Sequence, residues 1–243
     1  MISGGPPRLP IEGPEEIQEL SRGFNQMSEG LERLESERRL MLSGISHDLR
    51  TPLARLRVSV ELNRSALNPD HALGMIQDIT EMDDILGQFL EFARSDAQEA
   101  PHSFNLNERV SELCARYRLS GQHIETSLGA TGPVRLRKLA IRRLLTNLID
   151  NALRYGVKDV EVSTSRTDSQ IVLTVADRGP GIATADPSEL IRAFAREEPA
   201  RGQPGMGLGL AIVERIARTH AGRLDLVNRP GGGLIARVTL HTD

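Results

Sequence analysis

The sequence predicts a two-part protein, a long α-helical hairpin followed by an α/β sandwich in which helices cover one sheet. The first observation is a coiled-coil spacing of apolar residues, three and four apart, that runs from Ile17 to Val60. The second is the alternation of helical and strand-like patterns after residue 98. With 39% hydrophobic residues the chain can form a core, and its net charge of −3 argues against nucleic acid or an anionic membrane as a partner.

The helical hairpin begins after a connector of 14 residues that is rich in Gly and Pro. A helix is expected from Pro14, because Glu15 and Glu16 suit the positive N-terminus of a helix. The segment 65–70 breaks the periodicity, and a second helix is expected to follow as far as Ala93. A second copy of the hairpin would bury both apolar stripes, so we expect a homodimeric four-helix bundle. The alternative, a lone amphipathic helix on a globular core, is disfavoured by the narrow apolar seam and its charged flanks.

The second part, residues 99–243, predicts mixed α and β structure. Helices are expected over 107–119, 137–155 and 208–221, and strands over 123–128, within 158–178 and within 222–241. Gly156 and Gly222 are expected to cap the ends of the last two helices. The single cysteine, Cys114, excludes an internal disulfide and a CxxC zinc pattern, and we expect it in the core. No apolar run approaches the ~20 residues that span a bilayer.

The first helix carries the octapeptide SHDLRTPL at 46–53. His47 lies at the rim of the apolar stripe, and Asp48 could take the Nδ1 proton of its imidazole, which leaves Nε2 as a nucleophile. Thr51 lies one turn further on the same face, where its hydroxyl could hold a water molecule. Pro52 removes a helical hydrogen bond and allows the helix to kink. A His-Asp pair alone is more often a solvated surface pair, so the argument depends on the whole octapeptide.

This octapeptide resembles the H box of sensor histidine kinases, in particular their osmosensor-like branch. The resemblance implies that His47 is the phosphorylated residue, that Asp48 is its acid/base partner and that Thr51 orients water for dephosphorylation of a response regulator. Upstream, the helix resembles the second helix of a HAMP signalling module whose first helix is missing. The implied domains are a partial HAMP module at 1–36, a dimerisation and histidine phosphotransfer domain at 37–98 and a catalytic ATP-binding domain at 99–243.

Three motifs of the α/β part predict a nucleotide site. Asn147 and Asn151 are four residues apart on one helix, so their amide oxygens project from one face and could ligate Mg²⁺, with Arg154 placed to meet a phosphate. Asp177 is of the right type to accept a hydrogen bond from an adenine amino group, and the nearby glycines would let the backbone approach a flat base. Glycines before the last helix would expose N–H groups to phosphate. The glycines of these two motifs are Gly179, Gly181, Gly205, Gly207 and Gly209.

Each motif alone also fits a plain loop or surface amides, but in this order they resemble the N box and the two glycine boxes of the same kinases. The resemblance implies a Bergerat or GHKL-type ATP-binding fold, with ATP and Mg²⁺ bound and with Tyr155 and Leu210 among the nucleotide contacts. It also implies a mobile lid between Phe194 and Gly205. Phe194 resembles the F-box residue of the family, and a simple core position is its alternative.

The resemblance implies a protein-histidine kinase that phosphorylates His47 and passes the phosphoryl group to a response-regulator aspartate, with phosphatase activity toward that regulator. A gyrase-like ATPase is the first alternative, but it would carry a general-base Glu where this chain has Asn147, and it would lack the H box. A dimeric scaffold without activity is the second, although no motif residue is lost. The parent protein is expected at the cytoplasmic side of the bacterial inner membrane, with this part soluble and without direct membrane contact.

Overall fold

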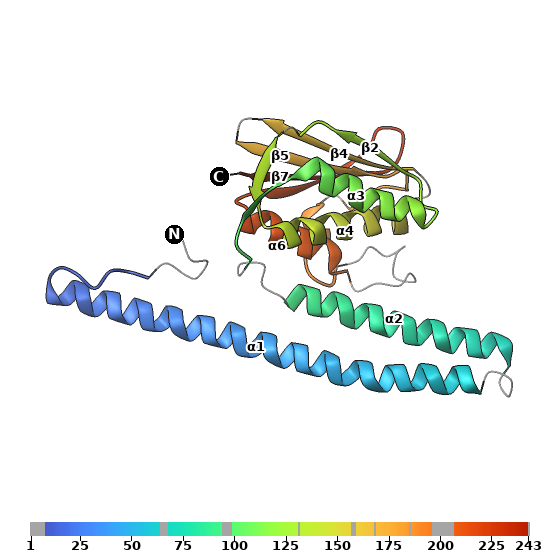
Figure 1. Ribbon diagram of the computed structural model, residues 1–243, viewed down its shortest axis with the longest axis horizontal. Coiled ribbons are helices and arrows are strands. Elements are labelled where there is room, and N and C mark those ends of the chain that lie inside the picture. The colour runs from blue at the N-terminus through green and yellow to red at the C-terminus, as the bar shows by residue number, and fades with distance from the viewer. Residues whose placement is uncertain are drawn as a thin grey trace. The chain divides into compact units, whose positions relative to one another are not determined.

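The computed structural model describes residues 8–63, 68–93, 99–130, 132–156, 159–167, 169–184, 186–195 and 207–242 (Figure 1). At some helical positions, His47 among them, only the backbone is described. The chain divides into two compact units, Met1–Gln98 and Glu99–Asp243. No helix in these described ranges is both long enough and apolar enough to cross a membrane.

The first unit is the predicted helical hairpin, formed by α1 (Glu15–Leu62) and α2 (Pro69–Ala93). Pro14 is the N-cap of α1, as expected, and the helix continues on both sides of Pro52. An ion pair between Arg50 Nε of the octapeptide and Asp83 Oδ1, 2.9 Å apart, joins the two helices. The predicted hairpin is thus confirmed, since α1 and α2 contact one another. Within one chain, however, much of the apolar surface of α1 stays exposed.

The uncovered surface is the coiled-coil stripe of α1. Leu20, Leu34 and Met41 are each more than 60% exposed. Large apolar side chains are more often buried in the core of a globular protein. Much of the stripe is therefore open to another helix, although Val60 near its end is buried. Among the side chains that the structure describes, the exposed apolar ones on this face are Ile17, Leu20, Met27, Leu31, Leu34, Met41, Ile45, Leu49 and Leu56.

The connector before α1 is tied to the helix by one side chain. The amide of Asn25 accepts a hydrogen bond from the backbone N–H of Leu9 (2.8 Å) and donates one to the carbonyl of Leu9 (2.9 Å). Arg8 and Glu29 add an exposed ion pair at 3.2 Å. Residues 8–13 therefore run along the polar side of α1 and do not cover its apolar stripe.

The second unit is the predicted α/β sandwich. Its main sheet has the strand order β2-β4-β5-β7-β6, in which only the β2–β4 pair is parallel. Helices α3, α4 and α6 cover one face of this sheet (Figure 1). The bounds are α3 Leu106–Leu119, β2 Ile124–Leu128, α4 Lys138–Tyr155, β4 Val160–Thr167, β5 Gln170–Ala176, α6 Gly209–Thr219, β6 Arg223–Asn228 and β7 Leu234–His241.

The core of this unit follows the alternation of the strands. Side chains at alternate positions of β4 and β5 are buried, and they face the apolar sides of the helices. Cys114 is buried on α3, as expected, and burial raises the pKa of its thiol. The fully buried large side chains include Leu106, Ile141, Leu144, Leu145, Leu148, Ile149, Ile171, Leu173, Ile212 and Ile216.

Three short elements were not predicted. Strands β1 (His102–Asn105) and β3 (Pro133–Leu136) form a separate antiparallel pair, and α5 (Ser188–Ile191) is a single helical turn. Four-residue strands carry too little periodicity to be recognised, and their pairing with a segment about 30 residues away decides their conformation.

Gly156 caps the end of α4 as expected, whereas the C-cap of α6 is His220 and not Gly222. Gly156 is the C-cap of α4 but has an extended φ of −76°, and a Cβ there would lie 2.8 Å from Cβ of Asp177. After α6, Ala221 takes the left-handed conformation, with φ 50°, while Gly222 lies where a Cβ would meet the Thr239 carbonyl. Close approach of other atoms, which at Gly156 include the Ala152 carbonyl oxygen of α4 itself, therefore requires glycine at both positions, and left-handed capping does not.

The N-terminus of α4 is capped from outside the helix. No local side chain caps it, but the Glu99 carboxylate accepts hydrogen bonds from the N–H groups of Leu139 (2.7 Å) and Ala140 (3.0 Å). Arg137 donates to the carbonyl of Glu99 and to that of Thr219. The first residue of the second unit is thereby fastened to the helix that carries Asn147 and Asn151.

Glu99→Ala is expected to destabilise the second unit by about 1–2 kcal/mol, because two N–H groups and the positive end of α4 lose their partner. Denaturant unfolding of residues 99–243 followed by circular dichroism measures this change. Glu99→Gln should lose less, since it keeps one acceptor. Glu112→Ala, which removes only an exposed ion pair with Arg109, is the matched control and should cost less than ~0.5 kcal/mol. An equal effect of Glu99→Ala and Glu112→Ala would contradict the capping role.

Candidate active site

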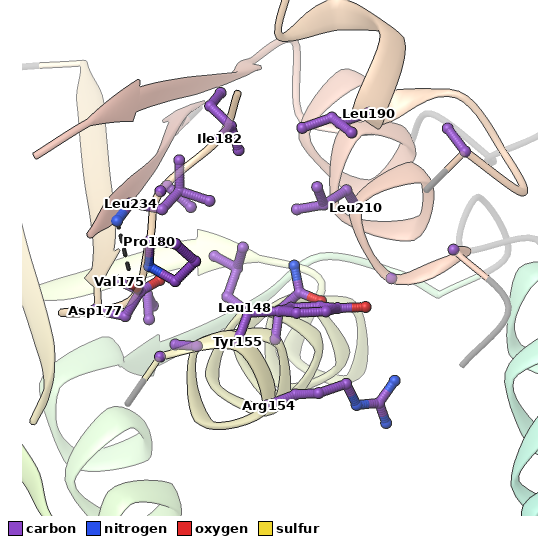
Figure 2. Close-up of a pocket in the computed structure, with 18 of the residues that line it drawn as sticks. Leu148, Arg154, Tyr155, Val175, Asp177, Pro180, Ile182, Leu190, Leu210 and Leu234 are labelled. Atoms are coloured by element: carbon purple, nitrogen blue, oxygen red, sulfur yellow. Dashed lines mark hydrogen bonds between the residues drawn. The ribbon is translucent and has the colours of Figure 1, made fainter. Parts of the chain in front are cut away.

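A pocket of about 550 Å³ opens between α4, the loop after β5 and the start of α6 (Figure 2). It brings together residues from all three predicted nucleotide motifs. Its lining residues are Leu148, Asn151, Ala152, Arg154, Tyr155, Gly156, Val175, Asp177, Pro180, Gly181, Ile182, Ala183, Leu190, Ala195, Gly207, Gly209, Leu210, Leu234 and Ala236.

The walls of the pocket are largely apolar. Figure 2 shows Val175, Pro180 and Leu234 on the side of Asp177, with Leu190 and Leu210 across the opening. Such a slot with few polar groups suits a flat ligand that presents apolar faces and a polar edge.

Asp177 is the buried polar group of this slot, with 5% of its surface exposed. Its Oδ1 accepts hydrogen bonds from the backbone N–H of Gly179 (2.8 Å) and of Leu234 (3.1 Å). Within the described part of the chain, its second oxygen, Oδ2, accepts none. The carboxylate is therefore held in one orientation and keeps one free acceptor for a ligand.

The glycines after Asp177 are explained first by neighbouring protein segments. A Cβ on Gly179 would lie 2.4 Å from the carbonyl oxygen of Tyr155. Gly181 has φ +75°, and a Cβ there would lie 2.5 Å from Oδ1 of Asn228. Only Gly181 of the two lines the pocket. We expected both positions to be glycine so that a flat base could approach the backbone. At Gly179 the structure gives a different reason, because the end of α4 packs closely against this loop.

The start of α6 faces the two asparagines of α4. Gly207 (φ +69°) and Gly209 line the pocket, whereas Gly205 lies outside the described residues. Asn151 also lines the pocket, and a Cβ on Gly209 would lie 3.3 Å from Oδ1 of Asn147. The structure thus brings both amides to the N-terminal end of α6, where free N–H groups and the helix dipole favour an anion.

The other residues of the α4 motif point in different directions. The ring of Tyr155 lies in the pocket next to Leu148, and the side chain of Arg154 extends away from Asp177 (Figure 2). Asp150 faces α3, where it accepts a 2.6 Å hydrogen bond from the Tyr117 hydroxyl. Burial raises the pKa of Asp150, and burial together with this hydrogen bond raises that of Tyr117. Asp150 therefore joins α4 to α3 and is no part of the pocket.

The predicted lid, 195–204, lies almost wholly outside the described residues. Phe194, just before it, is 55% exposed and has a left-handed φ of 68°, so the core alternative for this residue is wrong. Its backbone N–H donates to the carbonyl of Gly207 at 3.1 Å. Leu210 lines the pocket, and its contact with a nucleotide stays a prediction.

The octapeptide lies within α1 of the other unit. Asp48 and Thr51 are exposed side chains there, and the His47 side chain lies outside the described residues. An exposed position is what a residue needs if it is to exchange a group with another protein or domain.

Sequence reasoning missed a second loop that supports the pocket. Leu234 and the turn before β7 contact the Asp177 segment, and Asn228 at the end of β6 holds the backbone of Ile182. The signal in the sequence was the run NRPGGG at 228–233, which is typical of a turn.

The donor set of the pocket fits Mg²⁺ bound together with phosphates. In the described ranges no group of three His, Cys, Asp or Glu side chains could hold a metal ion by itself. The amide oxygens of Asn147 and Asn151 are hard oxygen donors beside the N-terminus of α6, which favours an anion. Mg²⁺ usually takes most of its ligands from phosphates and water.

Two families match the chain. Residues 37–98 match the His Kinase A (phospho-acceptor) domain, and residues 137–243 match the histidine kinase-, DNA gyrase B- and HSP90-like ATPase. The fold class and the pocket thus define an ATPase-type domain joined to a phosphoacceptor hairpin.

Relatives agree over nearly the whole chain. Sensor histidine kinase GtrS of Pseudomonas aeruginosa is 36% identical over 240 residues, which are 98% of this chain and 49% of that protein. The signal transduction histidine-protein kinase/phosphatase MprB of Mycolicibacterium vanbaalenii is 28% identical over 96% of this chain and 51% of its own length. The crystal structure of full-length ShkA in complex with AMPPNP shares the fold, with a TM-score of 0.66 and 20% identity over 83% of this chain and 45% of that chain.

The chain belongs to the sensor histidine kinases. It spans about half the length of the two curated relatives named above.

Proposed function

We propose that this chain binds ATP in the pocket, phosphorylates His47 and transfers the phosphoryl group to an aspartate of a response regulator. The observation that carries the proposal is the presence, in one chain, of an H box on a phosphoacceptor hairpin and of a pocket whose buried carboxylate keeps one acceptor free. ShkA binds a nucleotide analogue, AMPPNP, with the same fold.

The pocket suits ATP in two parts. Oδ2 of Asp177 would accept a hydrogen bond from the adenine amino group, while Val175, Leu234 and the opposite apolar wall would cover the faces of the base. The phosphates would lie toward Gly207 and Gly209 at the start of α6. Mg²⁺, held through Asn151 and Asn147 together with the phosphates, would neutralise phosphate charge.

In the transfer step, Nε2 of His47 attacks the γ-phosphorus, the bond to the β–γ bridging oxygen breaks, and ADP leaves. Asp48 stabilises the imidazole by accepting a hydrogen bond from Nδ1–H, so that the charge developing on the ring has a partner. Asn147 supports transfer rather than hydrolysis, because an amide cannot act as the general base that would activate water. The phosphoryl group then passes from Nε2 to a regulator carboxylate.

The test is incubation of the purified chain with γ-labelled ATP, followed by purified response regulators. We expect an acid-labile, alkali-stable label on the chain, and then its transfer to a regulator within minutes. No label on a chain that binds ATP would contradict the kinase proposal, and label that never leaves the chain would contradict the transfer.

The wider setting is also a proposal. The parent protein would reach the inner membrane through segments beyond those present here, with the residues at 1–36 acting as part of a HAMP module. The connector is hydrogen-bonded to α1 through Asn25, which supports the proposal that it packs on this helix as part of the module.

The chain is expected to be a dimer at micromolar concentration, because a second hairpin would cover the exposed stripe of α1. Removal of this apolar surface from water contributes ~25 cal/mol per Å². Light scattering should give twice the mass of one chain, and Leu34→Glu together with Met41→Glu should shift the mass toward the monomer. The mass of a single chain across the micromolar range for the unaltered protein would contradict this expectation.

Two exposed residues near His47 are expected to separate the two activities. Asp48→Asn should reduce autophosphorylation by ~100-fold or more, since the imidazole loses its carboxylate partner. Thr51→Ala should leave autophosphorylation within a few fold and strongly reduce dephosphorylation of the regulator, because a hydroxyl can orient water but is no base near neutral pH. MprB, named as a kinase/phosphatase, supports testing for the second activity. Both rates are measured for both variants, and an equal loss of autophosphorylation in the two would show that the roles are wrongly divided.

A further inference from the structure

Two loops far apart in the sequence interlock behind the pocket. The first, 177–182, carries Asp177 and forms one wall, and the second, 228–234, joins β6 to β7. The carboxylate of Asp177 accepts the N–H of Leu234, and the N–H of Asp177 donates to the Leu234 carbonyl at 3.0 Å. Gly233, with φ +110°, has no room for a Cβ, which would meet the carbonyl of Asp177. The loop 177–182 is therefore fastened to the second loop at its first residue.

Asn228 fastens the other end of the same wall. Its Oδ1 accepts a hydrogen bond from the N–H of Ile182 (2.7 Å), and its Nδ2 donates to the carbonyl of Ile182 (2.8 Å). One carboxamide thus satisfies both backbone groups of Ile182, as a paired strand residue would. The orientation of the amide is determined by its partners, because only the nitrogen can face a carbonyl.

A shared carboxylate joins the starts of the two loops. Glu161 of β4 lies 2.8 Å from Arg229 of the second loop and 3.5 Å from Arg178 of the first. Arg178 is well exposed, so its ion pair with Glu161 contributes little to holding the first loop. The two-point contact of Asn228 is therefore the main restraint on the far end of the wall, where Gly181 and Ile182 line the pocket.

We propose that Asn228 is a positioning residue for the base-binding end of the pocket: by holding the backbone of Ile182 it keeps the wall 180–182 at the distance that a flat purine requires. The inference rests on the proposed binding of ATP. Asn228 touches no ligand itself, since its side chain lies on the exposed side of the loop and outside the pocket lining. Its replacement leaves the core untouched and frees a loop that must then be ordered when the nucleotide binds.

The test uses calorimetry of the full chain with adenosine and with Mg²⁺·ADP. Asn228→Ala should weaken both ligands by the same factor, about five- to tenfold, because the wall contacts the base and not the phosphates. Asn228→Asp has the same shape but turns a carboxylate oxygen toward the Ile182 carbonyl, so it should weaken binding at least as much. Binding of Asn228→Asp at wild-type affinity would show that the side chain only fills space, and would overturn the proposal.

Asn107→Ala is the matched control. The Asn107 amide also makes two long-range hydrogen bonds, to the Leu128 carbonyl (3.4 Å) and from the Thr164 hydroxyl (2.7 Å), but away from the pocket. It should lower the unfolding midpoint and leave the affinity of the folded chain unchanged. An equal loss of affinity in Asn107→Ala and Asn228→Ala would reduce the effect to general destabilisation and overturn the positioning role. Failure of the unaltered chain to bind either ligand would instead refute the proposed ATP site, and this inference with it.

Discussion

Replacing His47 by Gln is expected to abolish phosphorylation of the chain, a loss of about 1000-fold or more, because an amide nitrogen is no nucleophile at neutral pH. The change lies in α1 of the first unit, so the pocket of the second unit stays intact. Nucleotide affinity should therefore remain within about twofold of the unaltered chain. Labelling with γ-labelled ATP and calorimetry with ADP give the two measurements.

The control for this variant is His71→Gln, which alters an exposed histidine of α2 outside the octapeptide. It should be labelled at the normal rate. Acid-labile phosphate that persists on the His47→Gln chain would assign the phosphoacceptor to another residue, and the role of the octapeptide would have to be abandoned.

The second large effect is expected at Asp177. Asp177→Asn keeps an oxygen that can accept the N–H groups of Gly179 and Leu234, but it turns an NH₂ group toward the ligand. A donor would then face the amino group of adenine, and a lost hydrogen bond to a charged acceptor plus an unpaired buried group costs about 2–3 kcal/mol, or roughly 30- to 150-fold in affinity. Calorimetry with ADP should show this loss in a chain whose unfolding midpoint has changed little.

A base analogue sharpens the test of Asp177. Inosine diphosphate carries an oxygen where adenine carries the amino group, so the Asp177→Asn chain should prefer it relative to ADP, whereas the unaltered chain should prefer ADP. Asp177→Ala is less informative, because it also leaves the two N–H groups that Oδ1 holds without a partner. The same preference for ADP over inosine diphosphate in both chains would mean that Asp177 does not contact the edge of the base.

Much of the fold was predictable because its signals are local. The spacing of apolar residues along α1 is repeated over many turns, and the strands around β4 and β5 alternate over seven or eight residues. The strands β1 and β3 have four residues each and pair with one another across the intervening helix and strand. Their assignment therefore needed contacts that no local pattern contains.

The pocket residues likewise divide into those that a local motif predicts and those that only the folded structure identifies. Asn151, Asp177, Gly181, Gly207 and Leu210 were predicted from their motifs and line one pocket. Gly179 was predicted too, yet its Cα faces the end of α4. Further lining positions, among them Ile182, Leu190 and Leu234, carry ordinary apolar side chains that could as well belong to the core.

By itself, the sequence determined the hairpin and sandwich architecture, the H box with His47 and the chemical types that meet a nucleotide, because periodicity and motif chemistry reside in neighbouring residues. Only the tertiary structure decided how the Asp177 carboxylate is oriented and which side chain holds the wall beside it. Those hydrogen bonds join residues 57 and 46 positions apart, Asp177 to Leu234 and Ile182 to Asn228. Their geometry depends on the order of β5, β7 and β6 in the sheet, which brings both loops to one edge of the pocket.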